Sequence, residues 1–320
     1  MKTKCKSIIR VACHSFVGVV CAGAVILIAS STQAQNLFEA DEDSGNIYVF
    51  TPGGAQSTFA SGLNEPAGLA FNSAGDLFVA CVGGGVDKGF ITEITPGGVQ
   101  STFASGLDEP WGLAFNSAGD LFVACEGGSG LGGGGVGLKT GNIYEFTPGG
   151  VKSTFASALS YPAGLAFNGA GDLFVGNLTN VIEDKGYITE ITPGGVQSTF
   201  ASGLVYSEGL AFNSFGDLFV ANYSNNGNIT EFTPAGSQIT FASGLDYPRL
   251  LACNSAGDLF VANAGDNDII EITPVGAQSI FVSGLDDPDG LAFQPVPEPS
   301  ALGLLAVGAS TLLVCRRKLK

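Results

Sequence analysis

Side chains that could bind a ligand or a metal ion recur at two positions of a repeated segment. One position directly precedes the tripeptide Gly-Leu-Ala or a variant of it, and the other closes a run of the type Leu-Phe-Val-Ala. Carboxylate, amide, guanidinium and indole groups stand at these positions, whereas the only histidine, His14, lies in the N-terminal segment. The candidate residues are Asp41, Trp111, Asn177, Glu208, Asn222, Arg249, Asn263 and Asp289.

These residue types favour an oxygen-lined site over histidine chemistry. Because residues 35–320 contain no histidine, they cannot form a Ser-His-Asp triad or a histidine-ligated zinc site. Carboxylate and amide oxygens without histidine or thiolate suit a hard cation such as Ca²⁺. Loops such as 41–46 and 266–268 have part of a calcium-loop pattern but lack its full ligand spacing. Solvated acidic loops are the alternative interpretation.

An internal repeat supplies the elements that position these residues. The turn Thr-Pro-Gly-Gly or a variant occurs six times, at spacings of 44, 52, 45, 41 and 40 residues, and a run of the type Gly-Leu-Ala-Phe accompanies each copy. Each repeat contains four short β-rich runs separated by turn residues, which predicts one four-stranded antiparallel blade. The sequence therefore predicts an all-β fold, a six-bladed β-propeller.

The phase of the repeat predicts how the ring closes. Residues 37–41 correspond to the second strand of a blade, whereas residues 290–293 correspond to a first strand. Pairing these two segments completes the sixth blade and closes the ring. A closed ring lacks the exposed edges that an open array of repeats would have. The turn Asn-Ser-Ala-Gly-Asp joins strands one and two, so its aspartates are interpreted mainly as turn residues. They are Asp76, Asp120, Asp172, Asp217 and Asp258.

One face of the propeller is expected to carry the site. The loop into strand one and the loop after strand two open on the same face, and sequence variation, including the glycine-rich stretch 126–141, is concentrated there. One side of this face holds Ala67, Cys81, Trp111 and Cys125, and the opposite side holds the polar candidates named above. The sequence thus predicts a pocket mouth that is half apolar and half polar.

The charge of the propeller segment restricts its partners. Residues 35–294 contain 28 acidic and five basic side chains, a net charge of −23. Such a field repels phosphate backbones and anionic lipids, which excludes nucleic acids and favours divalent cations or basic and neutral ligands. The simpler interpretation is that the acidity keeps an exported protein soluble.

Three cysteines fall in the propeller segment. Cys253 replaces a phenylalanine of an inner strand and is interpreted as a core residue. Cys81 and Cys125 occupy equivalent places on adjacent blades, which are expected to lie farther apart than a disulfide allows. A bond between them stays open as the less favoured alternative.

Residues 1–34 have the features of a secretory signal peptide. A basic region ending at Arg10 precedes an apolar run, and small residues at Thr32 and Ala34 predict cleavage before Gln35. An uncleaved membrane anchor and a lipoprotein processed at Cys21 are the alternatives. Under the favoured interpretation the propeller comprises residues 35–294.

Residues 295–320 contain three elements in order. Pro297, Glu298 and Pro299 precede an apolar helix over 301–314, and a basic end includes Arg316 and Arg317. Fourteen apolar residues are fewer than the roughly 20 that span a bilayer comfortably. A transient transmembrane helix is therefore expected, with an ordinary tail anchor as the alternative.

This C-terminal segment resembles the PEP-CTERM sorting signal of exported bacterial proteins. The resemblance rests on Val-Pro-Glu-Pro, the apolar stretch and the Arg-rich end, in that order. It implies recognition by an exosortase-type processing enzyme and delivery to the cell surface or extracellular matrix. It also implies a Gram-negative host that makes exopolysaccharide. Contact with the membrane is then expected only through the two terminal segments.

The repeat resembles NHL repeats, which share Pro-x-Gly-Leu-Ala, a Gly-Asp turn and a strand ending in Val-Ala-Asn. It is also similar to the gluconolactonase (SMP-30) and streptogramin lyase propellers. In gluconolactonase-like enzymes a Glu, Asn and Asp set holds a metal, and this implies Glu208, Asn222 and Asp289 as counterparts, with Arg249 steering an anionic substrate. Streptogramin lyase chemistry uses a histidine base, which this segment lacks.

Two functions follow as expectations. The favoured one is a non-catalytic binding or structural propeller that contacts exopolysaccharide or a surface protein, because near-identical blades are unusual for an enzyme. The other is a Ca²⁺-dependent gluconolactonase-like hydrolase. The remaining pocket candidates, Asp41, Trp111, Asn177, Arg249 and Asn263, fit either function.

Overall fold

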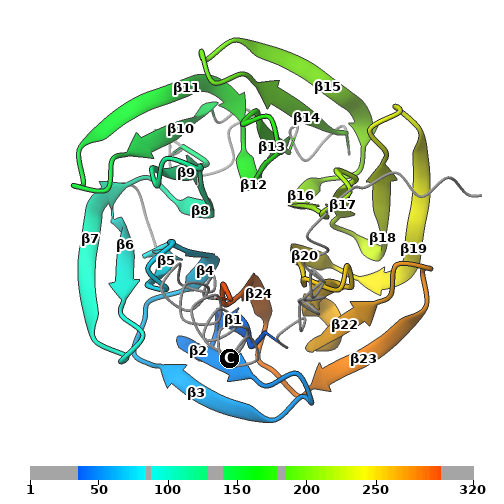
Figure 1. The fold of residues 1–320 in the computed structure, drawn as a ribbon, viewed down its shortest axis with the longest axis horizontal. Coiled ribbons are helices and arrows are strands. Elements are labelled where there is room, and N and C mark those ends of the chain that lie inside the picture. Colours follow the sequence, from blue (N-terminus) through cyan, green and yellow to red (C-terminus); the bar gives the residue numbers. More distant parts are fainter. Residues whose placement is uncertain (1–34, 84–87, 128–139, 179–184, 297–320) are drawn as a thin grey trace, which may run out of the picture. The chain divides into compact units, whose positions relative to one another are not determined.

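The computed structural model describes residues 35–83, 88–127, 140–178 and 185–296. Within these residues, 24 strands form six four-stranded antiparallel sheets arranged as blades around a central opening (Figure 1). The six-bladed β-propeller is thereby confirmed. The predicted signal peptide, the stretch 301–314 and the sorting residues from Pro297 onward lie outside the described residues. Within the described part, no helix is long and apolar enough to cross a membrane.

Five blades are continuous in the chain, with the innermost strand first. Blade 1 contains β4 (Pro66–Phe71), β5 (Leu77–Cys81), β6 (Gly89–Ile94) and β7 (Gln100–Leu107). Blade 2 contains β8 (Pro110–Phe115), β9 (Leu121–Cys125), β10 (Thr140–Phe146) and β11 (Lys152–Ser160). Blade 3 contains β12 (Pro162–Phe167), β13 (Leu173–Asn177), β14 (Gly186–Ile191) and β15 (Gln197–Leu204). Blade 4 contains β16 (Ser207–Phe212), β17 (Leu218–Asn222), β18 (Asn225–Phe232) and β19 (Gln238–Asp246). Blade 5 contains β20 (Pro248–Cys253), β21 (Leu259–Asn263), β22 (Asp268–Ile272) and β23 (Gln278–Ser283), with the short 3₁₀ helix η1 (Ala264–Asp266) after β21.

The sixth blade joins the two ends of the propeller segment. It contains β24 (Pro288–Phe293), β1 (Leu37–Asp41), β2 (Asn46–Phe50) and β3 (Gln56–Ala60), in that order. β1 and β24 are antiparallel, with Leu37 opposite Phe293 and Glu39 opposite Leu291. The predicted closure, a second strand at the start pairing with a first strand at the end, is confirmed (Figure 1).

The glycine of the Gly-Leu-Ala run is required by the close approach of the inner strands. A Cβ atom on Gly68 would overlap the backbone carbonyl oxygen of Trp111 on the next blade, and one on Gly112 would overlap that of Ala163. Any side chain there would push neighbouring blades apart. The glycine of the repeated motif is therefore explained by the packing of adjacent blades in the ring.

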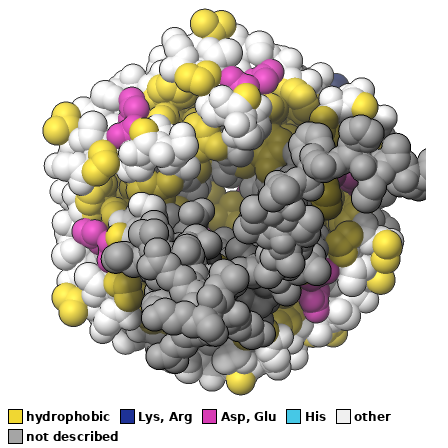
Figure 2. All heavy atoms as spheres, in the orientation of Figure 1, with side chains coloured by type: hydrophobic (Ala, Val, Ile, Leu, Met, Phe, Trp, Pro, Cys, Tyr) yellow, Lys and Arg dark blue, Asp and Glu magenta, His cyan; other side chains and the backbone are white. Residues whose placement is uncertain are grey.

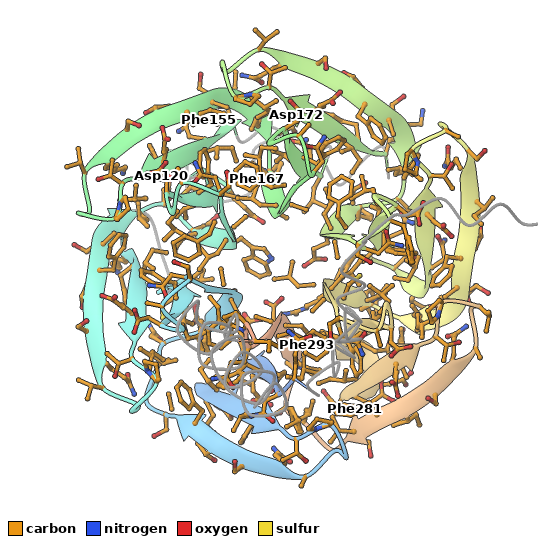
Figure 3. All side chains as sticks on the ribbon, viewed as in Figure 1. Asp120, Phe155, Phe167, Asp172, Phe281 and Phe293 are labelled. Carbon is orange, nitrogen blue, oxygen red and sulfur yellow. The ribbon has the colours of Figure 1, made fainter. Side chains whose placement is uncertain are left out.

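Phenylalanines fill the gaps between blades. Phe122 contacts Phe155 and Phe167 edge to face, with ring centroids 4.9 and 5.0 Å apart. Phe260 contacts Phe281 and Phe293 in the same way, and Figure 3 labels the partners Phe155, Phe167, Phe281 and Phe293. Figure 2 shows hydrophobic side chains in the gaps between blades and around the central opening. Most of the core thus lies between sheets.

The aspartates of the strand-one to strand-two turns serve the turn, as predicted, through a neighbouring asparagine. Asn116 Oδ1 accepts hydrogen bonds from the backbone N–H groups of Ala118 at 2.9 Å and Asp120 at 2.8 Å. Asn116 Nδ2 in turn donates to Asp120 Oδ2 at 3.0 Å. The same bonds recur around Asp172, which Figure 3 labels together with Asp120. The amide caps the backbone and the carboxylate orients the amide.

The three cysteines of the described residues are unpaired thiols. Cys81 and Cys125 are fully buried, and burial raises the pKa of these thiols to about 11 and about 12. Cys253 packs against the core between blades 4 and 5, as its place in the repeat predicts. These thiols are structural and unreactive at neutral pH.

Candidate functional site

Each inner strand is preceded by a residue with a left-handed backbone conformation. At these six positions φ lies between 40° and 61°, although none is glycine. The carbonyl of each such residue accepts a hydrogen bond from the backbone N–H of the residue following strand two, as Tyr206 does from Tyr223 at 3.1 Å. Such strain persists only where surrounding structure enforces it, and it clusters at functional sites. The six residues are Glu65, Glu109, Tyr161, Tyr206, Tyr247 and Asp287.

A pocket of about 560 Å³ opens among the loops of this face. Two of the left-handed residues, Tyr206 and Tyr247, contribute to it, and the Tyr247 ring packs on that of Tyr223 with centroids 4.9 Å apart. Its lining comprises Trp111, Glu126, Leu178, Tyr206, Glu208, Tyr223, Ser224, Asn225, Tyr247 and Arg249.

The pocket combines three residues that the sequence predicted for the site with tyrosines that it did not predict. Trp111, Glu208 and Arg249 stand on the inner strands β8, β16 and β20 and all line the pocket. The sequence signal for Tyr206 and Tyr247 was their place two residues before the candidate position. Trp111, expected on the apolar side of the mouth, thus shares a pocket with charged residues.

Arg249 is held by three carboxylates. Its Nη1 donates to Glu42 and to Asp289 Oδ2, the latter at 3.2 Å, and its Nη2 donates to Asp287 Oδ2 at 3.0 Å. Its side chain is 12% exposed. Burial alone would lower the pKa of the guanidinium, but the surrounding carboxylates, chiefly Asp289 and Glu208, raise it above its ordinary value. Arg249 therefore remains charged and engaged.

Two buried carboxyl groups flank Arg249. Burial raises the pKa of Glu208 well above its ordinary value, Asp289 raises it further, and Arg249 partly opposes both effects. Burial also raises the pKa of Asp289, to about 7, against the opposing effect of Arg249. Among the described residues, Asp289 Oδ1 has no hydrogen-bond partner. Asp289 therefore keeps one oxygen for Arg249 and one without a partner.

Two asparagines present amide oxygens without partners. Asn222 Nδ2 donates to Asn228 Oδ1 and Thr230 Oγ1, both at 2.9 Å, and Asn177 Nδ2 donates to Thr189 Oγ1 at 3.0 Å. The Oδ1 atoms of Asn222 and Asn177 are buried and accept no hydrogen bond from the described residues. These amides are oriented by their donors, which leaves two buried acceptors beneath the loop face.

The remaining two candidates hold loops. Asp41 accepts backbone N–H bonds from Ser44 at 3.2 Å and Asp286 at 2.8 Å. Asn263 accepts from the backbone N–H of Asp246 at 2.7 Å and donates to Asp268 at 2.9 Å. Both side chains fix the loops that surround the site.

The oxygen donors suit a hard cation in type. Glu208, Asn222 Oδ1 and Asp289 Oδ1 are the groups that Ca²⁺ would use. Two features weaken the fit: Arg249 places a positive charge on the other Asp289 oxygen, and no cluster of three or more Asp, Glu, Cys or His in the described ranges has metal-binding geometry. The three named side chains alone supply fewer than the six to eight oxygen ligands that Ca²⁺ takes.

A further carboxyl group, not recognised from the sequence, lies next to this site. Glu39 of β1 is completely buried, and neither of its oxygens has a hydrogen-bond partner among the described residues. Burial raises the pKa of Glu39 well above its ordinary value, and Asp41 and Asp289 add to the effect. The signal was present in the repeat, because the other five second strands have valine there.

The C-terminal segment and the propeller each have known counterparts. Residues 295–318 match the family model described as the PEP-CTERM protein-sorting motif. This motif signals an exported, surface-sorted protein and implies processing by an exosortase-type system. No curated protein matches the chain.

Solved propellers share the fold at low sequence identity. A protein assigned as a gluconolactonase is similar at a TM-score of 0.57 and 16% identity, over 79% of this chain and 86% of its own. Virginiamycin B lyase from Staphylococcus aureus is similar at a TM-score of 0.55 and 16% identity, over 82% of this chain and 89% of its own. A catalytically inactive form of that lyase with quinupristin has a TM-score of 0.55 and 16% identity, over 82% of this chain and 94% of its own. The chain is thus a six-bladed β-propeller, similar in fold to gluconolactonase-type propellers, with a PEP-CTERM sorting motif at its C-terminus.

Proposed function

We propose that this protein is an exported, surface-displayed propeller that binds an extracellular ligand, an exopolysaccharide or a surface protein, without transforming it. The observation that carries the proposal is the pocket on the loop-bearing face, where Trp111, Tyr206, Tyr223 and Tyr247 surround about 560 Å³. Aromatic walls with a few converging polar groups are typical of ligand sites. The PEP-CTERM motif supports delivery to the surface, where such ligands occur.

The composition of the pocket supports binding of a polar molecule with apolar faces. Tyrosine and tryptophan offer broad apolar rings together with a polar atom. Trp111 lines the pocket, and its Nε1 is buried and has no acceptor among the described residues. At the equivalent inner-strand positions of blades 1 and 3 stand Ala67 and Ala163, which are buried and do not line the pocket.

The lone tryptophan provides a direct test. Trp111 is the only tryptophan of the 320-residue chain, so its fluorescence reports on this pocket alone. Titration of the purified protein with polysaccharide fractions from the producing cells should give a saturable change. Tyr206→Ala should weaken binding at least tenfold. Tyr161→Ala is the matched control, since Tyr161 has the same left-handed conformation on blade 3 and does not line the pocket. Absence of any fluorescence response, or equal weakening by the two substitutions, would refute the proposal.

A Ca²⁺-dependent, gluconolactonase-like hydrolase is the second candidate. The unpartnered Oδ1 atoms of Asn222 and Asp289 favour it, and Glu208 would complete the set of ligands. Bound Ca²⁺ would polarise the carbonyl oxygen of a lactone. Because three carboxylates already hold Arg249, its charge is poorly placed to steer an anionic substrate.

Calorimetry with Ca²⁺ and an assay of lactone hydrolysis together separate the two candidates. The hydrolase predicts Ca²⁺ binding that Asp289→Asn and Asn222→Ala each abolish, together with lactone hydrolysis that a chelator stops and Ca²⁺ restores. The binding propeller predicts ligand affinity that a chelator leaves unchanged and no lactone hydrolysis above the buffer rate. Lactone turnover with this Ca²⁺ dependence would overturn the non-catalytic proposal.

A further inference from the structure

Four large apolar side chains are exposed on the face of the propeller opposite the pocket. This turn face is formed by the turns between strands one and two and between strands three and four of each blade. The four side chains lie on blades 4 and 5, and each is between 51% and 89% exposed. We call them the apolar patch: Phe215, Ile239, Val275 and Ile280.

The repeat shows that the fold does not require these side chains. The equivalents of Phe215 in the other strand-one to strand-two turns are alanines, and those of Val275 are glycines or Ala235. The equivalents of Ile239 are serines, and those of Ile280 are threonines. The same backbone therefore forms with small or polar residues at all four places. Clustered apolar side chains that the core does not bury typically mark an interaction surface.

The four positions follow one another across blades 4 and 5, which are adjacent in the ring (Figure 1). The turn with Val275 lies against the backbone carbonyl of Phe241 in β19, two residues after Ile239, and it leads into β23, which carries the fourth side chain. The turn with Phe215 lies beside the ring of Pro234, in the turn that leads into β19. The apolar patch therefore extends over neighbouring elements of one face.

The chain leaves the propeller beside the apolar patch. β24 runs from the loop-bearing face to the turn face and ends at Phe293. Gln35 connects this exit to blade 5, because its Nε2 donates to the carbonyl oxygen of Gln294 at 3.0 Å and its Oε1 accepts from the backbone N–H of Ser255 at 2.9 Å. The sorting residues begin at Pro297, four residues after Phe293 and thus at most about 15 Å from it.

We infer that the apolar patch is a docking surface for the exosortase-type enzyme that processes this chain. A protein that engages residues 297–299 is larger than the short connection to β24, so it must approach the turn face next to blade 5. Contact with the apolar patch would then add to its recognition of the sorting motif. The ligand pocket opens on the opposite face, so this inference does not depend on the ligand of the propeller.

Affinity for the purified processing enzyme, measured in detergent, tests the inference. The full chain should bind at least tenfold more tightly than a synthetic peptide of residues 295–320, which has the sorting motif without the apolar patch. A patch variant that restores the residues of the other blades should bind no more tightly than the peptide. It combines Phe215→Ala, Ile239→Ser, Val275→Ala and Ile280→Thr. Equal affinities of chain and peptide, unchanged binding of the patch variant, or no binding by either chain or peptide would overturn the inference.

Exposed valines of blades 1 to 3 provide the matched control. Val99→Ser, Val151→Ser and Val196→Ser together remove comparably exposed apolar side chains from the turn face and should leave the affinity for the enzyme unchanged. Both multiple variants should keep the urea midpoint of the wild type, because the side chains that they change are exposed. An equal loss of affinity in the two variants would refute a specific role of the apolar patch.

Other occupants of the apolar patch would give different results. A dimer seen by analytical ultracentrifugation and abolished in the patch variant would assign the surface to a second copy of the chain. Binding to enzyme-free phosphatidylcholine vesicles that the patch variant abolishes would assign it to lipid. Either result, with the affinity for the enzyme unchanged by the patch variant, would overturn the inference.

Discussion

Glu39 of β1 occupies the position that Val261 occupies in β21, and both side chains are completely buried. In four further blades the equivalent residue is also a buried valine: Val79, Val123, Val175 and Val220. The blade that closes the ring therefore carries a carboxyl group where the fold elsewhere uses a hydrocarbon. Its two oxygens have no hydrogen-bond partner among the described residues.

Glu39→Val should stabilise the propeller. The substitution restores the side chain that five blades use and removes a buried polar group without partners, a change worth about 1–3 kcal/mol in the free energy of unfolding. Urea unfolding followed by circular dichroism measures it. The reverse change in blade 4, Val220→Glu, is the matched control and should destabilise. A lower urea midpoint for Glu39→Val would contradict the prediction and would indicate that Glu39 has a partner such as a bound ion.

The stability should also depend on pH through Glu39. Burial raises the pKa of Glu39 above its unfolded value, so the folded state holds the proton more tightly than the unfolded state. The contribution of Glu39 to the free energy of unfolding is present below the unfolded pKa, about 4.3. It is lost as the pH rises through the folded pKa. The stability advantage of Glu39→Val over wild type should therefore grow between pH 5 and pH 8. A constant difference would show that the folded pKa is not raised.

Arg249→Met should destabilise strongly. It leaves Asp289, Asp287 and Glu42 close together without their shared cation, and removal of one partner from a buried ion pair costs about 3–5 kcal/mol. Thermal unfolding measures the loss. Lys152→Met is the control, because the exposed Lys152 only lies over the ring of Tyr144, 3.7 Å from its centroid, and should cost about 1 kcal/mol or less. Similar losses from the two substitutions would contradict the buried network.

Gly112→Ala should destabilise although it adds only a methyl group. The new Cβ would overlap the carbonyl oxygen of Ala163, so two inner strands must separate, which typically costs about 1–3 kcal/mol. Gly53→Ala is the matched control, since no atom lies within 4 Å of its Cβ position and its φ is not positive. Equal urea midpoints for the two variants would refute the close packing of the inner strands.

The site could be predicted only in part. The repeat register located Trp111, Glu208 and Arg249, because equivalent positions of a ring project toward the same opening. It could not show that Asp41 and Asn263 are occupied by loop backbone, nor that Tyr206 and Tyr247 join the pocket, because these contacts depend on how each loop folds back. Whether Glu208, Asn222 and Asp289 hold a metal stays a prediction.

The sequence by itself determined the propeller, its six blades and the strand that closes it, together with the sorting motif at the C-terminus. Turn residues, the alternation of apolar and polar residues in strands and the phase of the repeat are local or periodic signals. They can therefore be recognised in one sequence. Only the tertiary structure decided the partners of Arg249, since Glu42 lies 207 positions away in the sequence and Asp287 lies 38 away on another blade. Ring closure brings such residues together, and their contact has no local or periodic signal in the sequence.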